Sequence, residues 1–225
     1  MRRILLRSVG ALTAFLLLAP ASHADSIIIS PSSATASSSF NSLTSSLGID
    51  NTIDQAGLSA GFSSGVTSFD TYMAGNPLHS MFAGNNEWFS QAFMETAQID
   101  YDLGATMTLD RLALWNEDSS GIGSFDLLVS SDGTNYVQML TGVTPADNPV
   151  NQDYAAEVFG FDPMEARYVR LAISGCPQGD SRFMACGIGE VAFATVNTTP
   201  VPIPPAALLF GSALGLLGWR RRRLP

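Results

Sequence analysis

Ile99-Asp100-Tyr101-Asp102-Leu103-Gly104 places apolar side chains at every second position, with carboxylates between them. An extended segment with this alternation has one apolar and one polar face, as a half-buried strand requires. Further apolar segments follow as far as Val196, at Leu109–Trp115, Phe125–Ser130, Tyr136–Leu140, Ala156–Phe161, Tyr168–Ile173 and Ile188–Thr195. Turn residues separate them, and a short helix fits only residues 66–73. The sequence therefore predicts an all-β, antiparallel sandwich.

The first 24 residues have the three parts of a secretory signal peptide. Three arginines precede the apolar run Val9–Leu18, and Ser22-His23-Ala24 has the small-x-small form of a cleavage site. An uncleaved anchor is the alternative, but the run is shorter than the about 20 residues that span a bilayer. We expect cleavage after Ala24, with Ala21 as the second choice.

The C-terminus carries a second apolar stretch. Val201-Pro202-Ile203-Pro204-Pro205 precedes residues 206–219, and four arginines follow at 220–223. The 19 residues from Val201 to Trp219 can span a membrane if the tilt is small, and the arginines should hold their end in the cytoplasm. The domain would then face outward.

This tail is either a permanent anchor or a sorting signal. Its three parts resemble the PEP-CTERM signal of Gram-negative bacteria that make exopolysaccharide, in the VPLPA-like variant, with Val201, Pro202, Pro204 and Pro205 as the motif. Ile203-Pro204 stands where the commonest form has Glu-Pro. The resemblance implies a transient inner-membrane anchor, processing by an exosortase-type protease, and export to the cell surface or extracellular matrix.

These signals divide the chain into six parts. We expect a signal peptide at 1–24, a Ser-rich leader at 25–47, the β domain at 48–196, a Pro-rich linker with the sorting motif at 197–205, a transmembrane segment at 206–219 and a basic cytoplasmic tail at 220–225. The leader is either flexible or holds a first strand around Ile27-Ile28-Ile29.

The exported segment is strongly acidic. All 20 acidic residues but only four of the 11 basic ones lie between Asp25 and Trp219, so its formal charge is −16, and the chain has no lysine. Such a field repels nucleic acid and anionic lipid and favours divalent cations. Nucleic-acid binding is therefore excluded from the expected functions.

Cys176 and Cys186 are the only cysteines. In an oxidising compartment, an even number of cysteines predicts a disulfide, which here would close the last loop. A metal or catalytic pair is the alternative, but no histidine lies nearby and the spacing is not C-x-x-C.

The Asp50–Gly57 stretch alternates carboxylate, amide and hydroxyl oxygens, which can wrap a hard cation such as calcium. An ordinary Asx-rich loop is the alternative, because the D-x-[DN]-x-[DN]-G pattern is absent. Trp88 and Phe89 could form a stacking platform for a sugar, but we expect core positions for them.

Five pieces in order resemble the discoidin, or coagulation-factor type C, family over roughly residues 48–196. They are I-x-x-D-L-G from Ile99, the apolar strand ending near Trp115, F-x-x-x-x-S-x-D-G from Phe125, A-R-Y-V-R-L from Ala166 and G-E-V from Gly189. The resemblance implies a galactose-binding-like jelly roll that binds ligands through loops at one end.

The resemblance also implies a structural calcium ion. Asp54 and Glu190 match the family's two carboxylate ligands, and Asn51 and Gly57 complete the candidate set. Asp54-Gln55 stands where the family usually has Asp-Gly, which puts the loop geometry in question. Arg170 matches a structural arginine that needs a carboxylate partner.

The candidate ligand loops lie around residues 79–82, 116–121 and 179–183. A sugar site combines an aromatic surface with hydrogen-bonding side chains. The candidates of these types are Phe82, Asn116, Glu117, Arg182 and Phe183, although a solvated loop explains each equally well.

Catalysis has little support in the sequence. His79 is the only histidine after signal removal, no G-x-S-x-G elbow occurs, and no spacing singles out a carboxylate pair for a glycosidase. We therefore expect no enzyme.

The first hypothesis for the function is an exported binding module for polysaccharide. The alternative is a structural or adhesion protein that contacts other matrix proteins, and a glycosidase is a distant third.

Overall fold

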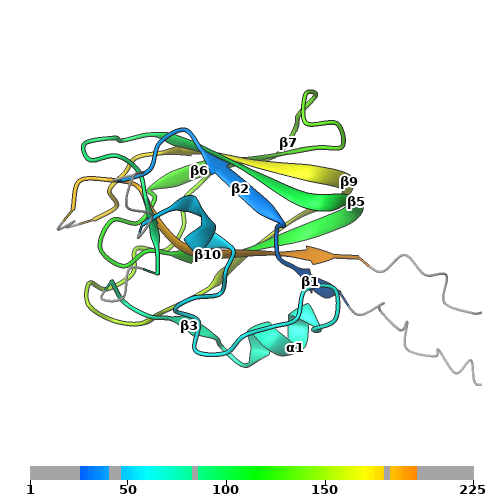
Figure 1. The fold of residues 1–225 in the computed structure, drawn as a ribbon, viewed down its shortest axis with the longest axis horizontal. Helices are drawn as coiled ribbons and strands as arrows, with labels where there is room; N and C mark the ends of the chain where they lie inside the picture. Colours follow the sequence, from blue (N-terminus) through cyan, green and yellow to red (C-terminus); the bar gives the residue numbers. More distant parts are fainter. Residues whose placement is uncertain (1–25, 41–46, 83–85, 180–182, 197–225) are drawn as a thin grey trace, which may run out of the picture. The chain divides into compact units, whose positions relative to one another are not determined.

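The computed structural model describes residues 26–40, 47–82, 86–179 and 183–196, which form an almost all-β structure (Figure 1). The strands are, in chain order, β1 (Ile27–Ile29), β2 (Ser33–Ala36), β3 (Leu78–His79), β4 (Trp88–Phe89), β5 (Ala97–Asn116), β6 (Ser124–Ser130), β7 (Val137–Val143), β8 (Tyr154–Ala155), β9 (Glu157–Ser174) and β10 (Gly187–Thr195). The helical segments are the 3-10 helix η1 (Ile49–Thr52) and the α-helix α1 (Phe69–Ala74).

The main strand network has the hydrogen-bonded order β1-β10-β5-β9-β6-β7, with β2 added to β5 and β4 to β10. β3 and β8 form a separate pair, and every pair of these strands is antiparallel. Figure 1 shows β2, β6 and β9 in one layer and β1 and β10 in a second. The predicted antiparallel sandwich is therefore confirmed.

β5 is longer than expected, because two segments predicted as separate strands are continuous in it. Gly104 lies between them at a φ of 81°, and the register of β5 against β9 shifts between Asp102 and Met107. Such a bulge bends a strand without ending it. As a result the first half of β5 pairs with β2 and the second half with β10.

β9 likewise joins two predicted strands and continues through Pro163. A proline cannot donate a ladder hydrogen bond and is tolerated in a strand at a bulge. Pro163 lies at such a place, between the pairs Arg111–Gly160 and Leu109–Met164, where the register shifts.

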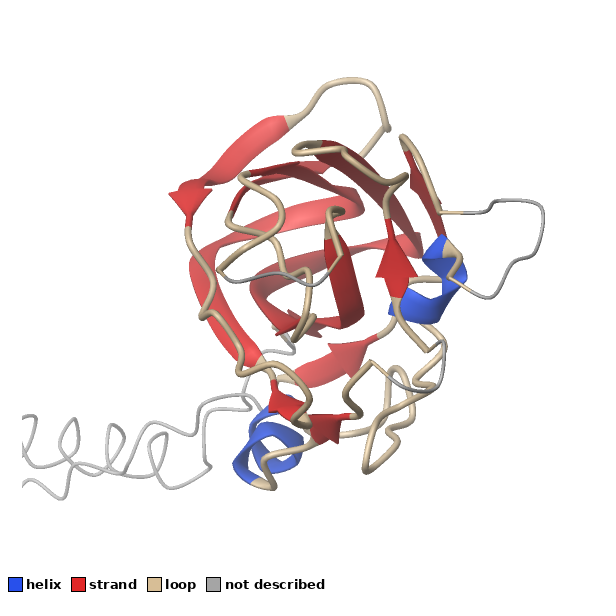
Figure 2. Cartoon of the chain, turned by 90° about the vertical axis from the view of Figure 1, so that its left-hand side faces the viewer, coloured by secondary structure: helices blue, strands red, loops and turns tan. Residues whose placement is uncertain are grey.

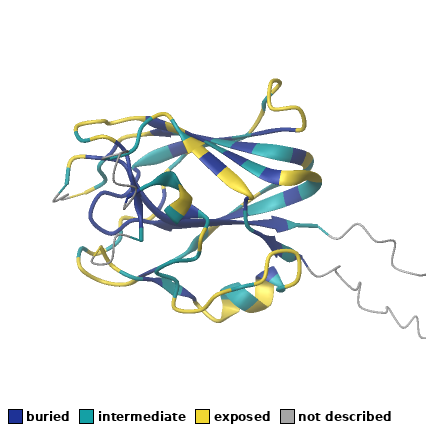
Figure 3. Cartoon of the chain, viewed as in Figure 1, coloured by how far each residue is buried: buried dark blue, intermediate teal, exposed yellow. Residues whose placement is uncertain are grey.

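The core lies between the layers, and Figure 3 shows buried positions alternating with exposed ones along the strands. Its largest fully buried side chains include Trp88, Trp115, Tyr101, Phe125 and Phe193. Full burial of such a side chain contributes about 1.5 to 3 kcal/mol. The expected core positions of Trp88 and Phe89 are confirmed, with exposed fractions of 0% and 1%.

The sheet begins earlier than the boundary expected at residue 48. β1 pairs with β10 through Ile27–Thr195, and β2 pairs with β5 through Ala34–Tyr101. The Ser-rich leader was expected either to be flexible or to hold a first strand around Ile27–Ile29, and the structure has that strand as β1. The Ser and Thr side chains of β2 are exposed while Ala34 is buried, so a small residue suffices for this edge position.

The predicted short helix is α1, which starts at Phe69 rather than near Val66. Ser68 caps it, since its Oγ accepts a hydrogen bond from the Thr71 amide. Phe69 is buried under the Arg111 guanidinium, 4.5 Å from the ring centroid, and Arg111 also pairs with Asp70. These contacts attach the helix to β5.

Arg170 has the carboxylate partner that the resemblance implies. Its Nε and Nη2 donate to the two oxygens of Asp100, at 2.5 and 3.1 Å, across the β5–β9 ladder. Both side chains are about 30% exposed, so the pair lies on the sheet surface rather than in the core.

The predictions for both chain ends fall outside the described residues: the signal peptide at 1–24, the linker with the sorting motif Val201–Pro205, the transmembrane segment at 206–219 and the basic tail at 220–225. Within the residues that the structure does describe, no helix is long and apolar enough to cross a membrane. The predictions about export and anchoring stay predictions.

Candidate functional site

A pocket of about 480 Å³ opens among the loops at one end of the sandwich. Figure 2 looks onto this end, where the loops from several strands meet. The residues that line the pocket come from seven separate places in the chain: Phe40, Leu47, Phe82, Phe89, Asp118, Ser119, Val150, Asn151 and Phe183. The pocket therefore exists only when the whole sandwich is assembled.

Four phenylalanines form the walls of the pocket and fix one another edge to face. The ring centroids lie 5.2 Å apart for Phe82 and Phe89, 5.5 Å for Phe89 and Phe183, and 5.0 Å for Phe40 and Phe183. Each edge-to-face pair contributes about 0.5 to 1.5 kcal/mol beyond area burial. Because Phe89 is buried and Phe82 is 46% exposed, the cluster runs from the core to the surface.

Asp118 fixes two of the loops around the pocket. Its Oδ1 accepts a hydrogen bond from the Phe82 amide at 3.0 Å, and its Oδ2 accepts one from the Asn151 amide at 2.7 Å. The side chain is 4% exposed, so both bonds are sheltered from water. One carboxylate thus holds the β3–β4 loop and the β7–β8 loop together.

Asp118→Asn is expected to lower the melting temperature, because an amide has one oxygen and its NH₂ group would face a backbone N–H. Loss of a sheltered charge-assisted hydrogen bond costs about 2 kcal/mol. Thermal unfolding followed by circular dichroism measures the effect, with Asp162→Asn on an exposed position of β9 as the control. Equal melting temperatures for the two variants would contradict this role.

We predicted that Asn116 and Glu117 bind the ligand. In the structure, neither residue lines the pocket. Both are buried, at 3% and 1% exposure, because β5 extends to Asn116. Asn116 binds Ile122 through Oδ1 and the Gln178 side chain through Nδ2, each at 2.8 Å. Their hydrogen bonds shape the β5–β6 loop from below and leave no surface for a ligand.

Glu117 closes the tight turn that follows β5. Its Oε2 accepts hydrogen bonds from the amides of Ser119 and Ser120, and its Oε1 accepts one from the Ser119 hydroxyl. Burial, and next the adjacent Asp118 carboxylate, raise the pKa of Glu117 to about 8. A carboxyl with a raised pKa stabilises the fold fully below its ordinary pKa and loses that contribution as the pH rises.

The free energy of unfolding is therefore expected to fall between pH 5 and pH 9, and to fall less in Glu117→Gln. Glu87 and Glu190, whose pKa values burial also raises, act in the same direction in both proteins, so the difference between the two isolates Glu117. Urea unfolding at pH 5, 7 and 9 measures it. Parallel curves for wild type and variant would show that Glu117 does not titrate in this range.

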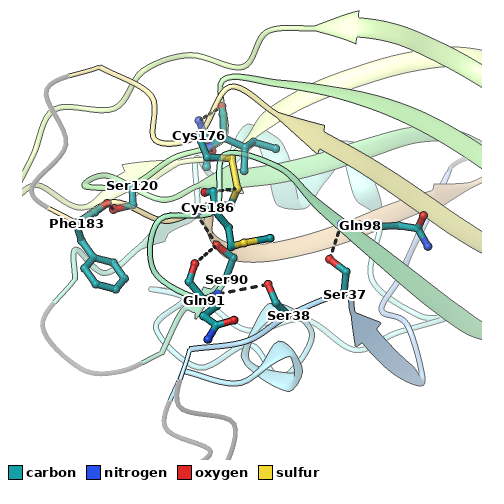
Figure 4. The surroundings of a disulfide bond; sticks show 12 residues. Ser37, Ser38, Ser90, Gln91, Gln98, Ser120, Cys176, Phe183 and Cys186 are labelled. Carbon is teal, nitrogen blue, oxygen red and sulfur yellow. Dashed lines mark hydrogen bonds between the residues drawn. A yellow bond between two sulfur atoms is a disulfide. The ribbon is translucent and has the colours of Figure 1, made fainter.

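The predicted disulfide is present: Cys176 and Cys186 are bonded and both are buried (Figure 4). Ser90 makes two hydrogen bonds with Cys186: the Ser90 amide donates to the Cys186 carbonyl, and the Cys186 amide donates to the Ser90 Oγ. The Ser120 hydroxyl donates to the Phe183 carbonyl. The bridge therefore closes the loop that carries the Phe183 wall of the pocket.

The Asp50–Gly57 loop lies against Glu190 of β10. The Glu190 side chain is fully buried, and its Oε2 accepts a hydrogen bond from the Gln55 amide at 2.8 Å. Its Oε1 has no hydrogen-bond partner among the described residues. Burial, with a smaller contribution from the Asp54 carboxylate, raises the pKa of Glu190 to about 9. A buried carboxyl oxygen without a hydrogen-bond partner leaves a place for a cation ligand bond.

The other candidate cation ligands are placed less directly. Asp54 is exposed, and its Oδ1 accepts a hydrogen bond from the Ala56 amide. The Asn51 Nδ2 donates a hydrogen bond to the Glu87 carbonyl. Gln55 has a φ of 64°, so it adopts the left-handed conformation that the glycine of the family would favour. Gly57 has a φ of 86°, and a Cβ there would lie 2.7 Å from the His79 ring.

No group of three or more His, Cys, Asp or Glu side chains in the described ranges is arranged to hold a metal. Calcium takes six to eight oxygens, many of them carbonyls. Glu190 and Asp54 would hold the ion here together with carbonyls of the Asp50–Gly57 loop, and the ion would supply the positive charge that Glu190 lacks.

Comparison with protein-family models gives one match, to the F5/8 type C domain, over residues 33–186. The chain belongs to the F5/8 type C domain family. The match begins at the first residue of β2 and ends at the second cysteine, so it includes the pocket and the disulfide. No curated protein is significantly similar in sequence to this F5/8 type C domain protein.

Solved structures with the same fold are distant in sequence. Chitosan-binding module 1 of a chitosanase/glucanase from Paenibacillus sp. IK-5 is 17% identical, with a TM-score of 0.50 over 76% of this chain and 99% of that one. A truncated AlyQ with CBM32 and alginate lyase domains is 20% identical, with a TM-score of 0.50 over 80% of this chain and 36% of that one. At these identities the likeness shows the fold alone.

In this F5/8 type C domain, the pocket brings together two of the predicted ligand residues, Phe82 and Phe183. Arg182 lies outside the described residues, and Asn116 and Glu117 lie beneath the surface. Sequence reasoning missed the remaining lining residues: Phe40, Leu47, Phe89, Asp118, Ser119, Val150 and Asn151. Asp118 directly follows two predicted residues, but nothing in the sequence shows that it would bind two distant loops.

Proposed function

We propose that this F5/8 type C domain is a non-catalytic module that binds polysaccharide in the pocket at its loop end. The observation that carries the proposal is the pocket itself, which phenylalanines line together with the polar residues Asp118, Ser119 and Asn151. A sugar ring presents C–H groups on its faces and hydroxyls at its edges. Rigid aromatic rings beside hydrogen-bonding groups match both properties.

The tryptophans give no support to the sugar-binding proposal. Trp88 and Trp115 are fully buried, and Trp219 lies outside the described residues. The exposed aromatic side chains are phenylalanines instead: Phe82 in the pocket, and Phe93, whose amide donates a hydrogen bond to the carbonyl of Met184, the residue after Phe183. Solved structures of the same fold include modules described as binding chitosan, which is consistent with a sugar ligand.

The place of action is part of the proposal and rests on the sequence. The signal peptide and the motif Val201–Pro205 would export the protein through a transient membrane anchor and an exosortase-type protease. The acidic exported segment would then meet extracellular polysaccharide in the matrix or on the surface of a Gram-negative cell. A matrix protein that binds other proteins is the alternative that the experiment must separate.

Affinity electrophoresis of the full-length protein in gels that contain chitosan, pectin, alginate or the host exopolysaccharide tests the proposal. We expect retardation by at least one polymer, and at least about tenfold weaker binding by Phe183→Ala, which removes a pocket wall. Phe62→Ala is the matched control, because Phe62 is a half-buried phenylalanine that packs on Tyr72, outside the pocket.

The melting temperature of both variants is measured first, so that misfolding is not read as lost binding. Equal retardation of Phe183→Ala and wild type would contradict the pocket as the site. No retardation by any polymer, with retention on matrix proteins instead, would favour the adhesion alternative.

A further inference from the structure

One phenylalanine of the loop end is held out into solvent. Phe93 lies in the turn between β4 and β5, and 81% of it is exposed, the highest fraction among the large hydrophobic residues that the structure describes. Its φ of 66° places it in the left-handed region. A bulky residue adopts this conformation at a cost in stability, and such strain concentrates at binding sites.

The turn that carries Phe93 is rigidly attached. The Phe93 amide donates to the Met184 carbonyl at 2.6 Å, and the Cys176 amide donates to the Glu95 carbonyl at 3.2 Å. Through these bonds and the disulfide, the turn is tied to the same loop that carries the Phe183 wall. The ring is therefore presented from a fixed backbone rather than from a free loop end.

The backbone of Phe93 is joined to the loop that carries a pocket wall. Met184, its hydrogen-bond partner, is the residue after Phe183, and consecutive Cα atoms are roughly 3.8 Å apart. Met184 and Met94 are themselves 47% and 38% exposed, so three exposed apolar residues lie on the two segments that this hydrogen bond joins. Single exposed apolar residues are ordinary on protein surfaces, whereas several on neighbouring segments favour a binding surface.

We propose that Phe93, flanked by Met94 and Met184, is an outer stacking platform, so that the site binds a polysaccharide along a run of several sugars rather than one terminal sugar. This inference rests on the proposed function. The pocket holds one sugar between its phenylalanine walls, and the chain that leaves the pocket lies across the ring of Phe93. Affinity then rises with the number of sugars until the platform is covered.

The test compares Phe93→Asn with Phe93→Tyr in the full-length protein. Asparagine tolerates a positive φ, so Phe93→Asn removes the ring while keeping the turn, and Phe93→Tyr keeps a ring. Val66→Asn is the control: Val66 is 75% exposed but lies near the far end of β10, where Thr67 and Gly65 bond to Ile28 of β1. Calorimetric titrations use chito-, galacto- and mannurono-oligosaccharides of one to six units.

The expected result is that wild type, Phe93→Tyr and Val66→Asn bind longer members of one series about tenfold more tightly than its monosaccharide. Phe93→Asn binds the monosaccharide within about twofold of wild type but loses the gain with length. Wild-type binding that does not depend on length, or an unchanged gain in Phe93→Asn, would overturn the platform and leave the pocket in place. If wild type bound no member of any series, the platform would fall together with the pocket.

Discussion

Calcium is expected to raise the melting temperature of the metal-free protein by about 10 °C. A ligand present at about 1,000 times its Kd stabilises the folded state by about 4 kcal/mol, and each kcal/mol shifts the melting temperature of a domain of this size by about 2 to 4 °C. We expect the effect to arise at Glu190, whose buried Oε1 lacks a hydrogen-bond partner among the described residues and whose pKa is raised by burial.

The variant Glu190→Gln distinguishes stabilisation by calcium from the stability of the metal-free fold. Without calcium, Glu190 is protonated at neutral pH because burial raises its pKa to about 9, and a glutamine amide has the same shape and charge as the protonated carboxyl. The variant should therefore melt near the metal-free wild type and gain little from calcium. Glu165→Gln, at an exposed position of β9, should keep the full gain. If calcium left the wild type unchanged, the Asp50–Gly57 loop would be an ordinary Asx-rich loop.

Loss of the disulfide is expected to have the second large effect. Replacing Cys176 and Cys186 by alanine opens a loop of ten residues, which in the chain-entropy model costs about 3 kcal/mol. The melting temperature should fall by about 6 to 12 °C. Differential scanning calorimetry with and without reductant measures the change.

Ligand binding should weaken as well, by roughly tenfold, because the same loop carries Phe183 and the partner of the Phe93 turn. The control is the double alanine variant, whose melting temperature and affinity should be the same with and without reductant. A reduced wild type with the oxidised protein's melting temperature and affinity would show that the hydrogen bonds to Ser90 and Ser120 hold the loop without the bridge.

The architecture was predictable where local pattern and tertiary environment agree. The alternation of Ile99, Tyr101 and Leu103 with two aspartates specifies a strand with one buried face, and all three apolar residues are in the core. The length of β5 was not predictable, because Gly104 is compatible with either a turn or a bulge. Only the pairing of β5 with β9 on both sides of Gly104 decides between them.

The site divides in the same way. The sequence by itself determined the strand pattern, the acidic character and the cysteine pair, and it pointed to Phe82 and Phe183, two of the residues that line the pocket. Tertiary structure alone decided that Asn116 and Glu117 are buried, and that Asp118 joins two loops more than 30 residues away from it. The reason is physical: a strand's period states which face a residue takes, whereas a pocket is made by segments that meet only after long-range strand pairing.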